Sequence, residues 1–122
     1  MQVNAHDYVE LKSEILDGMR SYMDDLRADG TDPGYAERDI DACEAIVDRY
    51  LDAARDAAGQ PAQARSALKT AVLALNALNA RCGHALIETE QREGLCDLLL
   101  GAAAEAGLGS GEEDLTEAWR EW

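Results

Sequence analysis

The stretch that decides the fold is Ser66–Cys82, SALKTAVLALNALNARC. Its only formal charges are Lys69 and Arg81, so a helix formed by it is apolar almost all round. A surface helix keeps a polar face, whereas a helix without one is covered on more than one side. The stretch therefore predicts the central helix of a helical fold, covered by other helices or by a second copy of the chain.

Three further segments show the apolar period of about 3.6 residues that is typical of helices. We expect helices over residues 6–28, 33–58 and 89–106, with Gly and Pro at the connections between them. Asp32 is the expected N-cap of the second helix, and Pro33 its first residue. The apolar positions that we expect to face the core are Leu11, Ile15, Met19, Tyr22, Leu26, Ala36, Ile40, Cys43, Val47, Tyr50, Ala54, Leu95, Leu98, Leu99, Ala102 and Ala106.

The central helix has two apolar sides. Placing its residues at steps of 100° gives one wide stripe and, opposite to it, Leu73, Ala77 and Ala80, where charged residues would normally lie. Asn79 falls within the main stripe and Asn76 on its border. The main stripe consists of Ala64, Leu68, Ala71, Val72, Leu75, Leu78 and Cys82.

No segment alternates with a period of two in the way of a strand. Four helices joined by short connections predict an all-α, antiparallel bundle over residues 1–108, because short loops make neighbouring helices antiparallel. Gly109, Ser110 and Gly111 form the expected flexible link. Residues 112–122 are expected to add a short C-terminal helix that docks on the bundle.

The charge balance limits the classes of partner. The 122 residues carry 25 acidic and 11 basic side chains, a formal net charge of -14. Nucleic acids and anionic membranes attract proteins through Lys and Arg, so we expect no direct binding to either. An acidic surface keeps a protein soluble, and it also suits a basic protein partner or an imitation of nucleic acid.

Features of the sequence also limit the location of the protein. Its three cysteines are an odd and widely spaced set, unlike the framework of a small secreted protein. The first residues lack the basic and then apolar pattern of a signal peptide, and no run approaches the 18 apolar residues of a membrane span. A cytoplasmic protein is the expectation.

The residue types that bind zinc occur at Cys43, Cys82, His84 and Cys96. The spacing contains no CxxC pair, and each Cys lies on an apolar helix stripe, so we interpret the three thiols as core residues. There is no GxSxG motif and no nucleotide-binding glycine loop. The sequence therefore predicts no metal, no cofactor and no catalytic residues.

Two alternative roles are open for the two asparagines of the central helix. Leaving a buried amide unpaired costs about 1–3 kcal/mol, so Asn76 and Asn79 need partners. They either bond the backbone of the connection at residues 83–88 or a neighbouring helix, or they form a small polar pocket. The residues of that pocket would be Asn76, Asn79, His84, Glu88 and Gln91.

The C-terminal segment holds both tryptophans. Leu115, Trp119 and Trp122 fall on one helical face, and Trp is enriched at interaction hot spots. The segment either covers an apolar groove on its own bundle or anchors a partner. We therefore predict a partner-binding surface made by Leu73 and Ala77 of the central helix together with these three residues.

The block LNALNARCGHALIETEQREGLC, residues 75–96, and the ending WREW resemble small uncharacterised helical proteins from bacteria. The resemblance covers roughly the C-terminal half and brings no catalytic or binding residues. The leading hypothesis is a non-enzymatic module that binds protein, as a homodimer, an adaptor, or an inhibitor or immunity-type protein. The alternatives are an acidic nucleic-acid mimic and a small-ligand or metal-dependent enzyme near Asn79, His84 and Glu88.

Overall fold

A computed structural model describes residues 5–109 and 113–122, and the side chains from residue 8 onward. In this part the chain is all-α, with four helices and no strand. Most of the predicted link lies outside the described residues, because these omit 110–112. The helices are α1 (Ala5–Ala28), α2 (Glu37–Asp56), α3 (Pro61–Arg81) and α4 (Thr89–Glu105).

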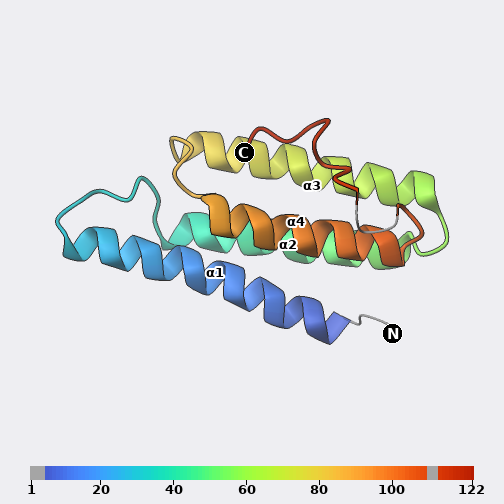
Figure 1. Ribbon diagram of the computed structural model, residues 1–122, viewed down its shortest axis with the longest axis horizontal. Helices are drawn as coiled ribbons and strands as arrows, with labels where there is room; N and C mark the ends of the chain where they lie inside the picture. Colours follow the sequence, from blue (N-terminus) through green and yellow to red (C-terminus); the bar gives the residue numbers. More distant parts are fainter. Residues whose placement is uncertain (1–4, 110–112) are drawn as a thin grey trace.

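The helices lie side by side along the long axis of the molecule. Following the colours of Figure 1, the chain runs one way along α1 and α3 and returns along α2 and α4. The most extensive contacts are those of α2 with α3 and of α1 with α4. Within the described residues α1 and α3 do not touch, so α2 and α4 separate them.

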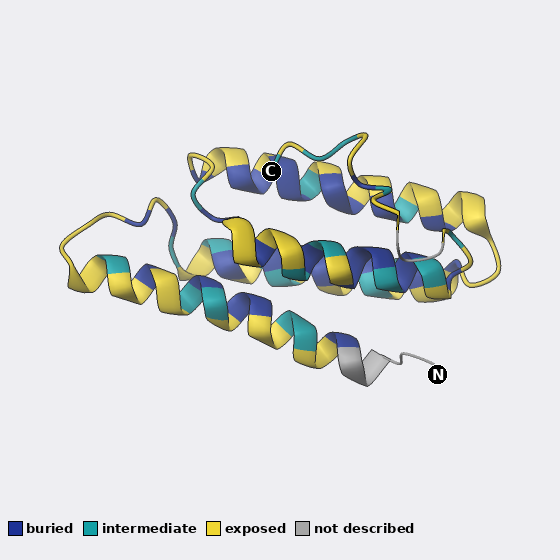
Figure 2. Cartoon of the chain, in the orientation of Figure 1, coloured by how far each residue is buried: buried dark blue, intermediate teal, exposed yellow. Residues whose placement is uncertain are grey.

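The prediction that α3 is a central helix covered on more than one side is wrong for the single chain, because within the described residues α3 packs against α2 and α4 through one side and does not contact α1. All seven residues of its main apolar stripe are buried, and so are Asn76 and Asn79. Leu73, Ala77 and Ala80 on the opposite side are exposed, and Leu73 shows 46% of its surface. Figure 2 shows this division as a dark inner side and a yellow outer side of the helix.

Helix α2 begins later than the sequence predicts. Asp32 does not cap it and Pro33 is not its first residue, since the helix starts at Glu37 with Ala36 as N-cap. Instead, Asp32 Oδ1 accepts a hydrogen bond from Gly34 N at 2.9 Å, which forms a local turn that competes with helix initiation. From Ile40 onward, the expected apolar seam of α2 is buried.

The buried face of α1 differs in part from the expected one, since Leu11 and Leu26 are only partly buried and Leu16 and Met23 join the core. Ile15, Leu16, Met19 and Met23 are buried, whereas Tyr22 is 44% exposed. Three residues after Met19, Tyr22 lies near the edge of the apolar stripe, and its hydroxyl can stay in water there. The prediction that Tyr22 faces the core is therefore wrong.

Two buried tyrosines hold parts of the bundle together: Tyr35 ties the connection before α2 to α1, and Tyr50 ties α2 to α4. Tyr35 Oη donates to Met19 O at 2.7 Å, and Tyr50 Oη donates to Leu99 O at 2.6 Å. Burial raises the pKa of Tyr35 to about 12 and raises the pKa of Tyr50 as well. Both hydroxyls thus remain neutral donors, as their main-chain acceptors require.

The structure does not confirm the short C-terminal helix. The described residues 113–122 form hydrogen-bonded turns, with Trp119 N and Arg120 N both donating to Thr116 O. Asp114 accepts hydrogen bonds from the main-chain N and the hydroxyl of Thr116, so the aspartate shapes a turn. In Figure 1 the segment runs over α3 and ends above it.

Candidate functional site

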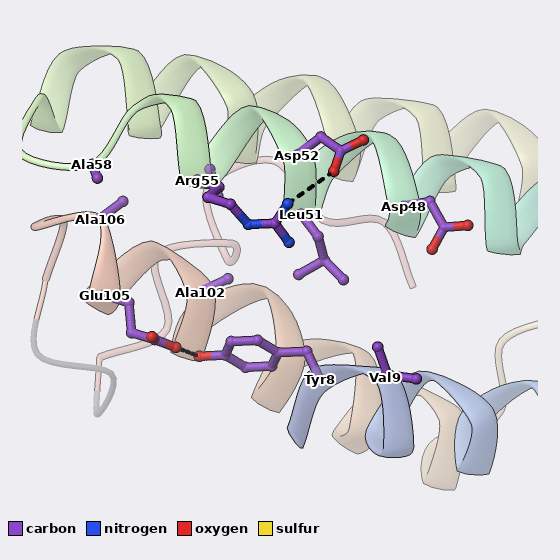
Figure 3. Close-up of a pocket in the computed structure, with 11 residues that line it drawn as sticks. Tyr8, Val9, Asp48, Leu51, Asp52, Arg55, Ala58, Ala102, Glu105 and Ala106 are labelled. Atoms are coloured by element: carbon purple, nitrogen blue, oxygen red, sulfur yellow. Dashed lines mark hydrogen bonds and ion pairs between the residues drawn. The ribbon is translucent and has the colours of Figure 1, made fainter. Parts of the chain in front are cut away.

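A groove of about 540 Å³ lies at one end of the bundle. We call it the acidic groove. Helix α2 forms one wall, and the start of α1 and the end of α4 form the other (Figure 3). Its lining consists of Tyr8, Val9, Asp48, Leu51, Asp52, Ala54, Arg55, Ala58, Ala102, Glu105 and Ala106.

The floor of the acidic groove is apolar. Ala54, Ala102 and Ala106 are buried, and Leu51 is half-buried and points from α2 into the space in Figure 3. Val9 on the first turns of α1 is 49% exposed. The small side chains of Ala54, Ala102 and Ala106 leave space between α2 and α4.

The rim of the acidic groove carries three carboxylates and one guanidinium. Arg55 Nη1 pairs with Asp52 Oδ1 at 3.3 Å, and Figure 3 shows both side chains at the mouth of the groove. The hydroxyl of Tyr8 donates to Glu105 Oε2 and links α1 to α4. Three acidic residues against one arginine give the lining a formal net negative charge.

A lysine stands beside this rim. Lys12 Nζ pairs with Asp48 Oδ1 at 2.7 Å and with Glu44 Oε2 at 3.3 Å. The hydrogen bond to Asp48 is the main reason why the pKa of Lys12 is raised, although desolvation opposes it. The lysine orients Asp48 and does not neutralise the row of carboxylates along α2, which are Glu44, Asp48, Asp52 and Asp56.

The residues of the predicted polar pocket have separate partners, and none of them lines the acidic groove. Asn79 Oδ1 accepts from Ile87 N at 3.0 Å, which is the predicted bond to the connection at residues 83–88. Asn76 instead contacts the C-terminal segment. Gln91 is buried and lies next to Gly18 of α1. Its Nε2 is 3.0 Å from the position that a Cβ would take at Gly18.

The other two residues of that predicted pocket are exposed. His84 follows the end of α3 with φ of 64°, and its main-chain N donates to Asn79 O at 2.8 Å. Glu88 is the N-cap residue of α4, and its main-chain oxygen accepts from Arg92 N at 2.8 Å. Both residues thus have backbone roles at helix ends, and neither lines the acidic groove.

The predicted partner-binding residues fall on two separate surfaces. Leu115, Trp119 and Trp122 are partly buried against the core of their own chain. Asn76 holds this segment with both ends of its amide: Nδ2 donates to Trp119 O at 2.8 Å and Oδ1 accepts from Glu121 N at 3.0 Å. Leu73 remains exposed, so the segment does not cover the outer side of α3.

Charged side chains flank the two indoles. The Arg65 guanidinium lies 5.0 Å from the ring centroid of Trp119, and that of Arg120 lies 5.4 Å from the ring of Trp122. Arg120 Nη2 also pairs with Asp114 Oδ2 at 2.7 Å. Among the described residues, Trp122 Nε1 is buried without an acceptor, which weakens the hold on the last residue.

The thiols lie in the core or at its edge. Cys43 and Cys82 are buried and Cys96 is partly buried, all three as free cysteines. Burial raises the pKa of Cys43 to about 12 and raises the pKa of Cys82 and of Cys96. No group of three or more His, Cys, Asp or Glu side chains placed to hold a metal ion occurs among residues 5–109 and 113–122.

Sequence reasoning missed the acidic groove because its parts are far apart in the chain. Tyr8 and Glu105 are 97 positions apart, and neither was expected to be functional. The one available signal was the alanine-rich ends of α2 and α4, since two facing runs of small residues leave space between helices. The alanine-rich ends alone do not locate a cavity, because the sequence does not show that α1 packs against α4.

In the part of the chain that the structure describes, no helix combines the length and the apolar content needed to cross a membrane. Comparison of the chain with protein-family models, curated proteins and solved structures found no match.

Proposed function

We propose that the protein is a non-enzymatic, cytoplasmic, acidic interaction module that binds a basic protein partner. Its framework is an antiparallel four-helix bundle, and its binding site is the acidic groove. An adaptor or an inhibitor of the immunity type fits this description, because such a protein acts by occupying a surface of its target. The proposal includes no direct binding of nucleic acid.

The observation that carries this proposal is the composition of the acidic groove. Its floor is apolar, and its rim holds Asp48, Asp52 and Glu105 against Arg55, with Lys12 paired to Asp48 beside the rim. An amphipathic helix binds in such a groove with its apolar face on the floor. Lysine or arginine residues flanking that face would meet the carboxylates, which favours fast and selective association with basic partners.

A second candidate, a nucleic-acid mimic, is favoured by the row of carboxylates on α2. Glu44, Asp48, Asp52 and Asp56 follow at steps of four residues, and each step advances about 6 Å along a helix. Regularly spaced negative charges resemble the charge pattern of a phosphate backbone. The partner would then be a nucleic-acid-binding protein, and duplex DNA would compete with the bundle for it.

Titration calorimetry with a synthetic probe tests the first proposal. The probe is an amphipathic helical peptide with leucines on one face and lysines beside it, at about 0.15 M salt, where charges separated by more than about 8 Å are screened. We expect the double variant Asp48→Asn, Asp52→Asn to weaken binding at least about tenfold, or 1.4 kcal/mol. Filling the groove by Ala58→Trp should weaken it as well.

The matched control is the double variant Asp24→Asn, Asp25→Asn, which removes the same charge from exposed positions of α1 outside the groove. Its affinity should stay within about twofold of the wild type, because screened charges contribute little. Equal losses in both double variants would show unspecific charge attraction and contradict the assignment of the groove. Displacement of a basic protein partner by duplex DNA would favour the mimic.

A further inference from the structure

The outer side of α3 forms an uncharged face that no other described part of the chain covers. Ser66, Thr70, Leu73 and Ala77 are all exposed along it, and Leu73 shows 46% of its surface. The C-terminal segment lies on another flank of α3, where it contacts Arg65 and Asn76. We call these four exposed residues the α3 face.

The α3 face continues into a second groove, of about 430 Å³, between α2 and α3. Ser66 and Thr70 belong to both surfaces. Ile46, Ala53, Ala67 and Ala74 add apolar atoms to the groove, and its two charged residues are Arg49 and Asp56. The charges of its lining therefore cancel, so the groove widens the α3 face without making it acidic.

Charge distinguishes the α3 face from the rest of the molecule. Helix α3 contains no Asp or Glu, and its charged residues are Arg65, Lys69 and Arg81. The other three helices all carry carboxylates on their outer sides, and the whole chain has a net charge of -14. Two copies of the chain that meet through other surfaces bring carboxylates together, and like charges in contact cost several kcal/mol.

The spacing of the α3 face is symmetric. The steps from Ser66 to Thr70, Leu73 and Ala77 are four, three and four residues, so the pattern is the same in both directions along the helix. A two-fold axis at the midpoint of this pattern, between Ala71 and Val72, places two antiparallel α3 helices face to face. Small residues at Ser66 and Ala77 allow a close approach, and the two Leu73 side chains meet beside the axis.

From these observations we propose that the α3 face is the interface of a symmetric homodimer. The occupant is a second copy of this chain, because the surface is uncharged, matches itself under a two-fold axis and lies on the helix without carboxylates. A basic partner has no acidic group to bind on this helix, whereas the acidic groove offers three. In such a dimer the acidic groove of each copy lies on other helices than the interface and stays accessible.

Measuring the mass of the protein by light scattering during size-exclusion chromatography tests this proposal. We expect twice the chain mass of 13.2 kDa at micromolar concentration. Leu73→Glu places two like charges beside the axis, and it should raise the dimer dissociation constant at least about 100-fold. The control is Tyr22→Glu on α1, where the tyrosine is 44% exposed, and its mass should equal that of the wild type.

Cysteine cross-linking tests the symmetry independently of folding defects. In a Cys96→Ser background, Leu73→Cys should form a disulfide-linked dimer on mild oxidation, because equivalent positions meet only near a two-fold axis. Ala62→Cys, at the start of the helix, should not. A monomeric wild type would overturn the proposal, and so would an unchanged dimer in Leu73→Glu or equal cross-linking at both positions.

Discussion

Asn76 and Trp119 are joined by one side-chain amide, whose Nδ2 donates to Trp119 O at 2.8 Å while its Oδ1 accepts from Glu121 N at 3.0 Å. The amide thus matches a donor and an acceptor of the C-terminal segment at the same time. This pair fixes the segment on α3, and it explains why a polar residue lies at the border of an otherwise apolar stripe.

Replacing this amide should loosen the C-terminal segment. Asn76→Ala removes two hydrogen bonds, each with a net value of about 0.5–1.5 kcal/mol, so we expect a loss of about 1–3 kcal/mol in the free energy of unfolding. Urea unfolding followed by tryptophan fluorescence measures it, since both tryptophans lie in the segment. The exposed substitution Ala62→Ser at the start of the same helix is the control, and an unchanged fluorescence transition in Asn76→Ala would contradict this role.

Asn79 has a different role, in the connection between α3 and α4. Its Oδ1 is the acceptor for the buried Ile87 N, and Asn79→Leu leaves that donor unpaired. We expect a loss of about 1–3 kcal/mol in stability, measured by thermal unfolding followed by circular dichroism. A variant as stable as the wild type that no longer binds a small ligand would instead support the polar pocket.

The contact between α4 and α1 should not tolerate a methyl group at Gly94. A Cβ at this position would lie 2.8 Å from Ile15 Cγ1, so overpacking, at about 1–3 kcal/mol, outweighs the gain of about 1 kcal/mol in helix propensity. In Gly18→Ala the Cβ meets only the end of the flexible Gln91 side chain, at 3.0 Å.

We therefore expect Gly94→Ala to be destabilised and Gly18→Ala to lie closer to the wild type in urea unfolding. Combining Gly94→Ala with Ile15→Ala should cost less than the sum of the two single changes, because truncating Ile15 makes room for the methyl group. Additive losses would show that the two positions do not clash.

Acidic pH should release the C-terminal segment through Asp114. Burial disfavours its charged form, but hydrogen bonds from Thr116 and Arg120 outweigh this effect and lower the pKa of Asp114 below its usual 3.8. Because the pKa of Asp114 is lower in the folded state, its charge stabilises the protein at any pH above the ordinary pKa of 3.8. This stabilisation is lost as the pH falls through 3.8 towards the lowered pKa.

Because Asp114 is partly exposed, the effect should stay below about 1 kcal/mol. Tryptophan fluorescence of the wild type and of Asp114→Asn, recorded as the pH is lowered, isolates it from the other carboxylates. The two proteins should differ near neutral pH and converge in acid. A constant difference across the titration would rule out a contribution from the charge of Asp114.

The helices follow from periodicity because each one buries a stripe that its own sequence defines. The core positions predicted for α2 from Ile40 to Ala54 and for α4 from Leu95 to Ala102 are all buried, although α4 also buries Leu100. The predicted start of α2 was wrong because Asp32 can either cap a helix or form a turn, and the surrounding packing decides between the two. Tyr22 was misplaced because an amphipathic side chain suits the edge of a stripe as well as its centre.

The candidate site depends on contacts between distant segments, which a single sequence does not display. The sequence identified Asn79 as needing a partner near residues 83–88, and this bond is present. The sequence pattern predicted one partner-binding surface with both Leu73 and Trp119. In the structure, the segment that carries Trp119 contacts Arg65 and Asn76 instead. The acidic groove arises only when the first turns of α1 meet the end of α4.

The most direct measurement for the acidic groove is differential capture of partners from the native cell at near-physiological salt. Three baits are compared by quantitative mass spectrometry: the wild type, Asp48→Asn with Asp52→Asn, and the control Asp24→Asn with Asp25→Asn. We expect a basic protein that the wild type and the control capture and the groove variant does not. Identical sets from all three baits, or no basic protein with any of them, would contradict it.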